Sequence, residues 1–396
     1  MKIAILLYKP MAMPPSGYEF PTLLMARSFI KLGHRVKLFA VGKVETEVNI
    51  ENGIKEAIIK GKTYPEKGFT FSRLKDFLVL YLLGYRPSIT KLNENENFIN
   101  KIKEYKPDLV VVSSIQIGQL ARKIKRQLKG TKVISYTDSY DLVEASFNSI
   151  MYSKMPNIVK KIIIAMAKEK YTKYMLTLYK NLIKVGDVIV MPTEKDKEKI
   201  IQKFGTEKSK IFVIPPISIP RITKRYKKVK MIKTITFIGV ADYGPNVEAV
   251  NVIKEKVAPK LKEIRFLIVG RGWKKEKQGN IDILGEVKDL KPIFNKTDAF
   301  IAPITSGAGM KTKIATYLEA GKPIIGTSVA FEGYGIEDSI GGIVEDNLDM
   351  IYERVYKFIN NKKLILKLQT NSQKRVNSFS EENITKQWKK VLNNVY

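Results

Sequence analysis

The chain has 396 residues, which is long enough for two domains that each bury a core. It is 44% hydrophobic and 28% charged, contains no cysteine, and has no run of the roughly 20 uncharged apolar residues that a membrane-spanning helix needs. This composition indicates a globular protein and excludes a disulfide framework and a thiolate metal site.

The formal net charge of +31 suggests three explanations. A basic surface binds nucleic acid, or an anionic membrane, or only reflects a lysine-rich composition. No helix-turn-helix, zinc-finger or RNP-type motif is present and the charge is spread widely, so nucleic acid is not an expected partner. The other two explanations stay open.

The first 41 residues predict a strand (2–8), a loop, a helix (18–32) and a second strand (36–41). Because Met1 and Lys2 lead straight into the first strand, with no signal-peptide cleavage site, we expect a cytoplasmic protein. Gly17 either stands where the chain can approach a ligand closely or is a plain glycine at a helix start. His34 is the only histidine and lies in a turn, where it is interpreted as structural, since one imidazole does not make a metal site.

Two further buried strands are predicted at 109–114 and 132–136, and the second ends in Thr137 and Asp138. Before and after these strands lie two stretches, 69–86 and 156–184, that combine lysines or arginines with large apolar residues. The second has the spacing of an amphipathic helix. Such a helix either packs on a core with a solvated basic face or lies on a membrane surface.

Residues 217–233 form a basic linker with no acid, and α/β alternation then resumes in the second half. Within that half, 298–327 predicts a strand, a loop of small residues, a helix over 310–320 and another strand. A helix that starts under a glycine-rich loop presents backbone N–H groups and a positive dipole end to an anion. Lys311 and Lys313 add two charges at this point, so the sequence predicts a phosphate site.

These motifs resemble those of the group 1, or family 4-like, glycosyltransferases, which use nucleotide sugars. The stretch from Pro303 to Thr327 reads Gly-x-Gly-Met-Lys-x-Lys followed by Gly-Lys-Pro-Ile-Ile-Gly-Thr. Phe237-Ile238-Gly239, the Leu267–Gly272 segment and the Leu284–Val287 segment match in the same order. The resemblance thus covers roughly 140 residues of the second half and continues in the turn around His34.

The resemblance implies an α/β fold of the GT-B type, in which two Rossmann-like, doubly wound domains face each other across a cleft. We expect an acceptor-binding domain over 1–216, a linker over 217–233, a nucleotide-sugar-binding domain over 234–379, and a C-terminal helix over 380–396 that crosses back to the first domain.

The resemblance also assigns roles to single residues. Asp138 and Lys311 would be catalytic, and Gly17 and Thr137 would lie on the acceptor side. The residues expected to bind the nucleotide sugar are Gly239, Arg271, Val287, Ser306, Gly307, Ala308, Gly309, Met310, Lys311, Lys313, Thr316 and Glu319. Two positions depart from the family: Thr316 replaces the glutamate that usually holds the donor ribose, and Thr137 replaces a histidine that contacts the reacting sugar.

No Asp-x-Asp motif is present, so neither a metal nor another cofactor is expected, and backbone N–H groups and lysines would meet the charge of the leaving group. The sequence therefore predicts a hexosyltransferase-like enzyme that moves a sugar from a UDP- or GDP-linked donor to a glycan or lipid-linked acceptor, at or near the cytoplasmic face of a membrane. One alternative is a protein of the same fold that has lost catalysis and only binds a sugar nucleotide or a partner. A nucleic-acid-binding protein is the distant third.

Overall fold

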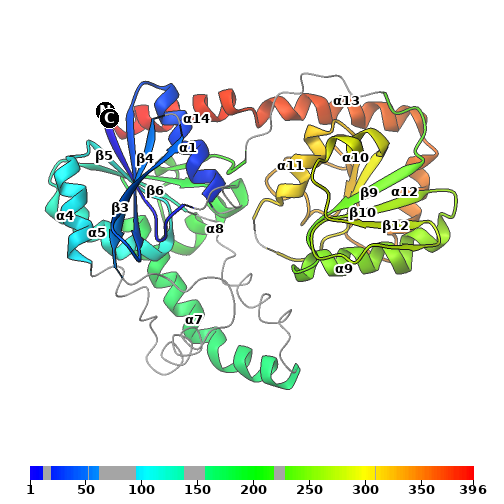
Figure 1. Ribbon diagram of the computed structural model, residues 1–396, viewed down its shortest axis with the longest axis horizontal. Coiled ribbons are helices and arrows are strands. Elements are labelled where there is room, and N and C mark those ends of the chain that lie inside the picture. Colours follow the sequence, from blue (N-terminus) through cyan, green and yellow to red (C-terminus); the bar gives the residue numbers. More distant parts are fainter. Residues whose placement is uncertain (12–18, 52, 62–94, 138–156, 218–227, 308) are drawn as a thin grey trace. The chain divides into compact units, whose positions relative to one another are not determined.

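The computed structural model describes residues 1–11, 19–51, 53–61, 95–137, 157–217, 228–307 and 309–396. The chain forms two compact units, of which the first contains Met1–Pro216 with Ile384–Tyr396 and the second contains Ile217–Asn383. Each unit has its own mostly parallel sheet with helices around it (Figure 1). The prediction of two Rossmann-like α/β domains is confirmed.

The first sheet has eight described strands in the order β3-β4-β2-β1-β5-β6-β7-β8. All neighbouring strands are parallel except β3 and β4, which pair antiparallel at the edge. The strands are β1 (Lys2–Leu6), β2 (Arg35–Gly42), β3 (Thr46–Glu51), β4 (Ile54–Lys60), β5 (Leu109–Val112), β6 (Lys132–Tyr136), β7 (Val188–Met191) and β8 (Ile211–Val213).

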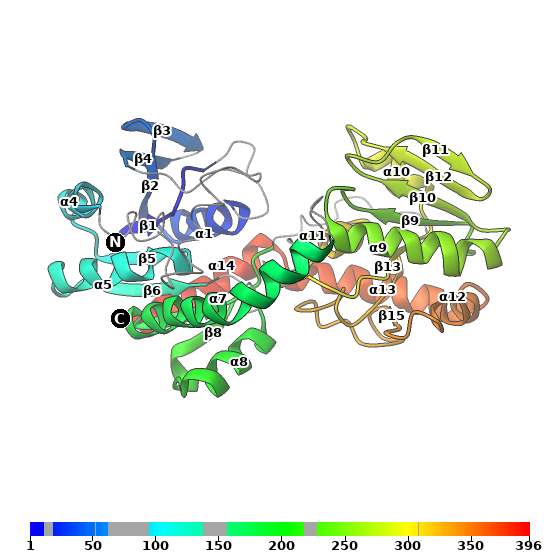
Figure 2. The same ribbon diagram turned by 90° about the horizontal axis from the view of Figure 1, so that it is seen from below.

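Helices cover both faces of this sheet (Figures 1 and 2). Strand β1 shows the reason: Ala4 and Leu6 pack into one core cluster, whereas Ile3 and Ile5 pack into another, because successive side chains of a strand point to opposite faces. The first cluster includes α4 (Glu96–Tyr105), α5 (Gly118–Gln127), α7 (Asn157–Val185) and α8 (Glu194–Phe204). The second includes α1 (Glu19–Lys31) and α14 (Glu381–Val395).

The second sheet has seven described strands in the order β11-β12-β10-β9-β13-β14-β15, and only β11 runs antiparallel to its neighbour. The strands are β9 (Thr234–Ile238), β10 (Arg265–Val269), β11 (Glu276–Gln278), β12 (Ile281–Gly285), β13 (Ala299–Ala302), β14 (Ile324–Gly326) and β15 (Ile343–Val344). Its helices are α9 (Gly244–Val252), α10 (Lys291–Lys296), α11 (Thr312–Glu319), α12 (Ile351–Ile359) and α13 (Lys362–Ser378).

Helix α14 brings the end of the chain onto the first sheet through Trp388. This side chain is 1% exposed. Its ring meets Phe29 of α1 edge-on at 5.1 Å and Tyr136 of β6 at 5.9 Å between ring centroids. Aromatic pairs at such distances add to the free energy of burial. The last helix is therefore part of the core of the first unit.

Replacing Trp388 with Ala should lower the free energy of unfolding by about 3–5 kcal/mol, because it leaves a cavity between α14, α1 and β6. Urea denaturation monitored by far-UV circular dichroism, which does not use tryptophan fluorescence, measures the change. The exposed neighbour Lys389→Ala is the matched control and should change stability by less than about 0.5 kcal/mol. Equal effects of the two substitutions would show that α14 is not part of this core.

Candidate functional site

A cavity of about 380 Å³ opens in the second unit where β9 and β13 end and α11 begins. Parallel sheets bind ligands beyond the carboxyl ends of their strands, and this cavity lies at that edge. Its described lining comes from the end of β9, the start of α9, the loop after β13 and the first turns of α11. The lining residues are Ile238, Gly239, Val240, Tyr243, Asn246, Ile304, Met310, Lys311, Thr312, Lys313 and Thr316.

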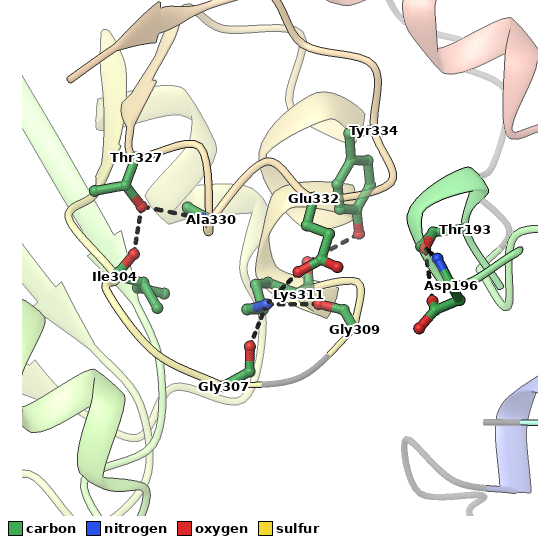
Figure 3. Close-up of polar contacts among 10 residues, drawn as sticks. All are labelled: Thr193, Asp196, Ile304, Gly307, Gly309, Lys311, Thr327, Ala330, Glu332 and Tyr334. Carbon is green, nitrogen blue, oxygen red and sulfur yellow. Dashed lines mark hydrogen bonds and ion pairs between the residues drawn. The ribbon is translucent and has the colours of Figure 1, made fainter. Parts of the chain in front are cut away.

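Lys311 orders the glycine-rich loop at the start of α11. Its ammonium group donates hydrogen bonds to the carbonyl oxygens of Gly307 (2.8 Å) and Gly309 (2.6 Å) (Figure 3). The backbone of Lys311 is extended, with φ −83° and ψ 109°, so α11 begins at Thr312 and not at 310 as the sequence predicted. No side chain caps this helix start. The first turn of α11 therefore faces the cavity as an uncapped helix N-terminus.

The segment after β14 holds Lys311 from the other side (Figure 3). A Glu332 carboxylate oxygen lies 3.8 Å from the Lys311 ammonium, and both side chains are 8% exposed. The Tyr334 hydroxyl donates to the Lys311 carbonyl oxygen at 2.8 Å. Thr327 closes the same segment, since its hydroxyl donates to the Ile304 carbonyl. These contacts were not predicted from the sequence; a Glu-Gly-Tyr-Gly stretch after a buried strand was the available signal.

Lys313 lies partly buried in the cavity wall. Its ammonium group donates to the Oδ1 atom of Asn246 and lies 4.7 Å from the centroid of the Phe237 ring. Burial, and secondarily the positive charge of Lys311, lower the pKa of Lys313 to about 7. The described contacts of Lys313 thus leave its charge without a carboxylate.

Tyr317 fixes α11 against the sheet. Its ring stacks on Phe300 of β13 at 4.2 Å, and its hydroxyl oxygen accepts a hydrogen bond from the backbone N–H of Ile238 at 2.9 Å. Since Ile238 lines the cavity, this contact joins the end of β9 to the helix that carries the two lysines.

Two glycines permit close approaches around the cavity. Gly307 has φ +105°, and a Cβ atom there would lie 2.5 Å from the hydroxyl oxygen of Tyr243. Gly270 has φ +149°, and a Cβ atom there would lie 2.1 Å from the carbonyl oxygen of Gly239. Any larger residue would clash with a part of the cavity wall, which accounts for glycine at both positions.

The structure brings five of the predicted donor-site residues into the cavity wall: Gly239, Met310, Lys311, Lys313 and Thr316. The carbonyl oxygens of Gly307 and Gly309 accept hydrogen bonds from the Lys311 ammonium group. The Ser306 hydroxyl is buried with no hydrogen-bond partner among the described residues. Like those three loop residues, three others do not line the cavity: Arg271, Val287 and Glu319.

Those three residues have other surroundings. Arg271 is exposed and lies 3.2 Å from the Asp242 carboxylate. Val287 is partly exposed. Glu319 is half-buried, and burial raises the pKa of its carboxyl while the charge of Lys291 opposes that rise. None of the three joins the described wall around the two lysines.

The predicted residues of the first domain give less information. Gly17 and Asp138, like Ala308 of the second, lie outside the described residues. Thr137 is 1% exposed, and its hydroxyl donates to the Met191 sulfur at 3.7 Å. In the described part of the chain, no group of three or more His, Asp or Glu side chains could hold a metal ion.

Comparisons with known proteins agree with this fold. The profile described as glycosyltransferase family 4 matches residues 16–217, just over half of the chain, and the profile described as glycosyl transferases group 1 matches residues 232–361. No curated protein matches the chain in sequence.

Among solved structures, the chain is similar to three glycosyltransferase-fold proteins at low sequence identity. Sucrose-phosphate synthase from Thermosynechococcus elongatus has a TM-score of 0.68 at 12% identity, covering 99% of this chain and 98% of that one. Anabaena HepE in complex with UDP-glucose has a TM-score of 0.62 at 11% identity over 99% of both chains. A glycosyltransferase from Rickettsia africae has a TM-score of 0.61 at 15% identity, covering 100% and 98%. The chain therefore belongs to the group 1, family 4 glycosyltransferases and has their GT-B fold.

Proposed function

We propose that this glycosyltransferase takes its sugar from a UDP- or GDP-linked donor whose diphosphate lies at the start of α11. The observation that carries the proposal is the convergence of Lys311 and Lys313 on one cavity wall, beside an uncapped helix N-terminus. A helix N-terminus and nearby cations form a site for phosphate. The UDP and UDP-glucose complexes of the similar HepE structures support a ligand of this class.

The same groups would serve the transfer step. When the bond between the sugar and the diphosphate breaks, negative charge develops on the leaving diphosphate. Positive groups and hydrogen-bond donors that are already in place stabilise this charge. Lys311 is fixed by loop carbonyls, and Lys313 by Asn246 and Phe237, so both charges are in place before the reaction. We propose that these groups meet the leaving-group charge without a metal ion.

Replacing Lys311 with Ala should weaken UDP binding by about 1–3 kcal/mol, the range for a lost charge-assisted contact, and calorimetry measures the change. Because the substitution also leaves Glu332 buried without this ion pair, the double variant Lys311→Ala/Glu332→Gln serves as the control. The double variant should regain stability but not affinity. Full recovery of UDP binding in the double variant would mean that the unpaired Glu332 carboxylate, and not the missing Lys311 charge, caused the loss in the single variant. No binding of UDP or GDP to the native protein would contradict the proposed donor site.

Affinity for a nucleotide sugar should fall as pH rises through about 7, because only the charged form of Lys313 attracts the diphosphate. UDP-glucose is the suitable probe, since its diphosphate diester does not titrate near neutrality. If one proton is taken up on binding, the dissociation constant should rise roughly 30-fold between about pH 6 and pH 8.5. Calorimetry at several pH values measures the change.

The variant Lys313→Arg is the matched control, because an arginine keeps its charge throughout this range and its profile should be flat. The stability of the ligand-free native protein is a second check, because it should change with pH in the direction opposite to the affinity. The unfolded chain holds the proton more tightly than the folded one, so this group makes the empty protein more stable as pH rises above about 7. A native affinity that is independent of pH would show that Lys313 is charged before the donor binds.

For the acceptor, we propose a glycan or a lipid-linked glycan, with the first domain docked on an anionic membrane. The described side chains of α7 from Tyr174 onward pack partly into the core, with Leu178 and Leu182 fully buried. The second half of α7 is therefore a core helix with a solvated basic face. A membrane contact would involve the first half of α7 together with residues 69–86, and residues 69–86 lie outside the described residues. None of the described helices is both long and apolar enough to cross a membrane.

Vesicles that contain anionic lipid should bind the protein at low salt and release it as salt rises through physiological strength, because each lysine near the surface contributes about 1 kcal/mol. Reversing the charge of Lys160, Lys161, Lys168 and Lys170 together should abolish sedimentation with vesicles. The matched control reverses four exposed lysines elsewhere in the same domain, namely Lys180, Lys184, Lys203 and Lys210, and should largely keep binding. Equal loss in both variants would indicate binding through net charge alone and no docking face.

A further inference from the structure

The cavity continues from the start of α11 along one face of that helix. Thr312 and Thr316 are one helical turn apart on the same face of α11, and both line the cavity with Lys313. With the phosphates at the helix start, the group bonded to them continues along this face. In UDP that group is the pentose, whereas a nucleotide sugar carries the pentose at one end of its diphosphate and the sugar at the other. We take the pentose to be the group beside Thr316, the cavity-lining residue one turn into α11.

The described cavity wall contains no carboxylate. Its only charged side chains are Lys311 and Lys313. The undescribed residues of this unit, 218–227 and 308, include no Asp or Glu in the sequence. A pentose diol binds most strongly to a carboxylate that accepts hydrogen bonds from both hydroxyls, and this wall offers none.

Three acids of this unit that are close in the sequence or in space to residues of the wall have other surroundings. Glu332 is buried against Lys311, and Asp242 pairs with Arg271 at the surface. Glu319, one turn after Thr316, is half-buried beside the charge of Lys291 and does not line the cavity.

Thr316 itself is a weak partner for a ribose hydroxyl. Its own hydroxyl donates back to the Thr312 carbonyl at 3.5 Å, the outer limit of a hydrogen bond. It keeps lone pairs to accept one neutral hydrogen bond, which is about half as strong as one to a carboxylate. A ribose 2′-hydroxyl therefore gains little at this position.

We infer that the donor site does not select for the ribose 2′-hydroxyl, and that it accepts 2′-deoxynucleoside diphosphate sugars, the dTDP-linked class, as well as ribonucleotide-linked ones. Affinity comes from the phosphate end of the donor, through the two lysines and the start of α11. This inference rests on the proposed donor site and specifies the nucleotides that it takes.

The direct test compares UDP with 2′-deoxy-UDP, which differ only in the 2′-hydroxyl, by calorimetry on the full chain. Dissociation constants within about threefold of each other are expected. A preference for UDP of tenfold or more would overturn the inference and leave the donor site intact, whereas binding of neither nucleotide would contradict the donor site itself.

Thr316→Glu tests the position. A carboxylate there should raise the preference for UDP over 2′-deoxy-UDP about tenfold, and the ratio cancels the general repulsion that the new charge exerts on both diphosphates. The neutral variant Thr316→Gln, of the same length, should raise the ratio less than threefold. An unchanged ratio in Thr316→Glu, with native thermal stability and measurable binding, would show that residue 316 does not face the pentose and would overturn the inference.

Discussion

A single buried charge organises the donor end of the second unit. The Lys311 ammonium is held by the carbonyl oxygens of Gly307 and Gly309 and by the Glu332 carboxylate, in surroundings where an unpaired ammonium would be costly. Three segments meet at this charge: the loop after β13, the start of α11 and the segment after β14. Because the carbonyl oxygens of two loop glycines accept hydrogen bonds from this ammonium group, the conformation of the loop at the helix start is fixed. In the proposed donor site, the position of a phosphate would therefore be set before the ligand binds.

Lys313 differs from Lys311 in the groups that compensate its positive charge. Lys311 has a carboxylate near it, whereas the described contacts of Lys313 are an amide oxygen and an aromatic ring. An amide and an aromatic ring stabilise a buried cation only in part. The pKa of Lys313 is therefore lowered by its burial and by the neighbouring Lys311 charge. In the proposed donor site, a diphosphate would supply the missing negative charge. The wall is therefore matched to an anionic ligand in a way that a fully paired surface is not.

Local sequence signals predicted much of this fold. Period-2 and period-3.6 patterns predicted the central strands and long helices. Thr193, a residue type favoured at helix starts, caps α8, where its hydroxyl oxygen accepts a hydrogen bond from the Asp196 backbone at 3.0 Å. The edge strand β3 was missed because four of its six residues are exposed, so no alternation in burial marks it. The motif from 303 to 327 located the cavity. It did not show that Glu332, some 20 residues later, would approach Lys311, because such a pairing depends on the return of the chain through β14.

The charges on the surface and the two lysines of the cavity attract anions over different distances. Two lysines line the cavity, whereas 70 basic residues are present, and many exposed ones pair locally, as Lys173 does with Glu169 and Lys125 with Asp187. Exposed charges attract anionic ligands from a distance, and salt screens them beyond about 8–10 Å. Lys311 and the partly buried Lys313 are shielded from that screening and fixed in direction. In the proposed function, the surface charge would thus contribute to encounter with the donor, whereas the two lysines that the fold has taken out of water would orient it for sugar transfer.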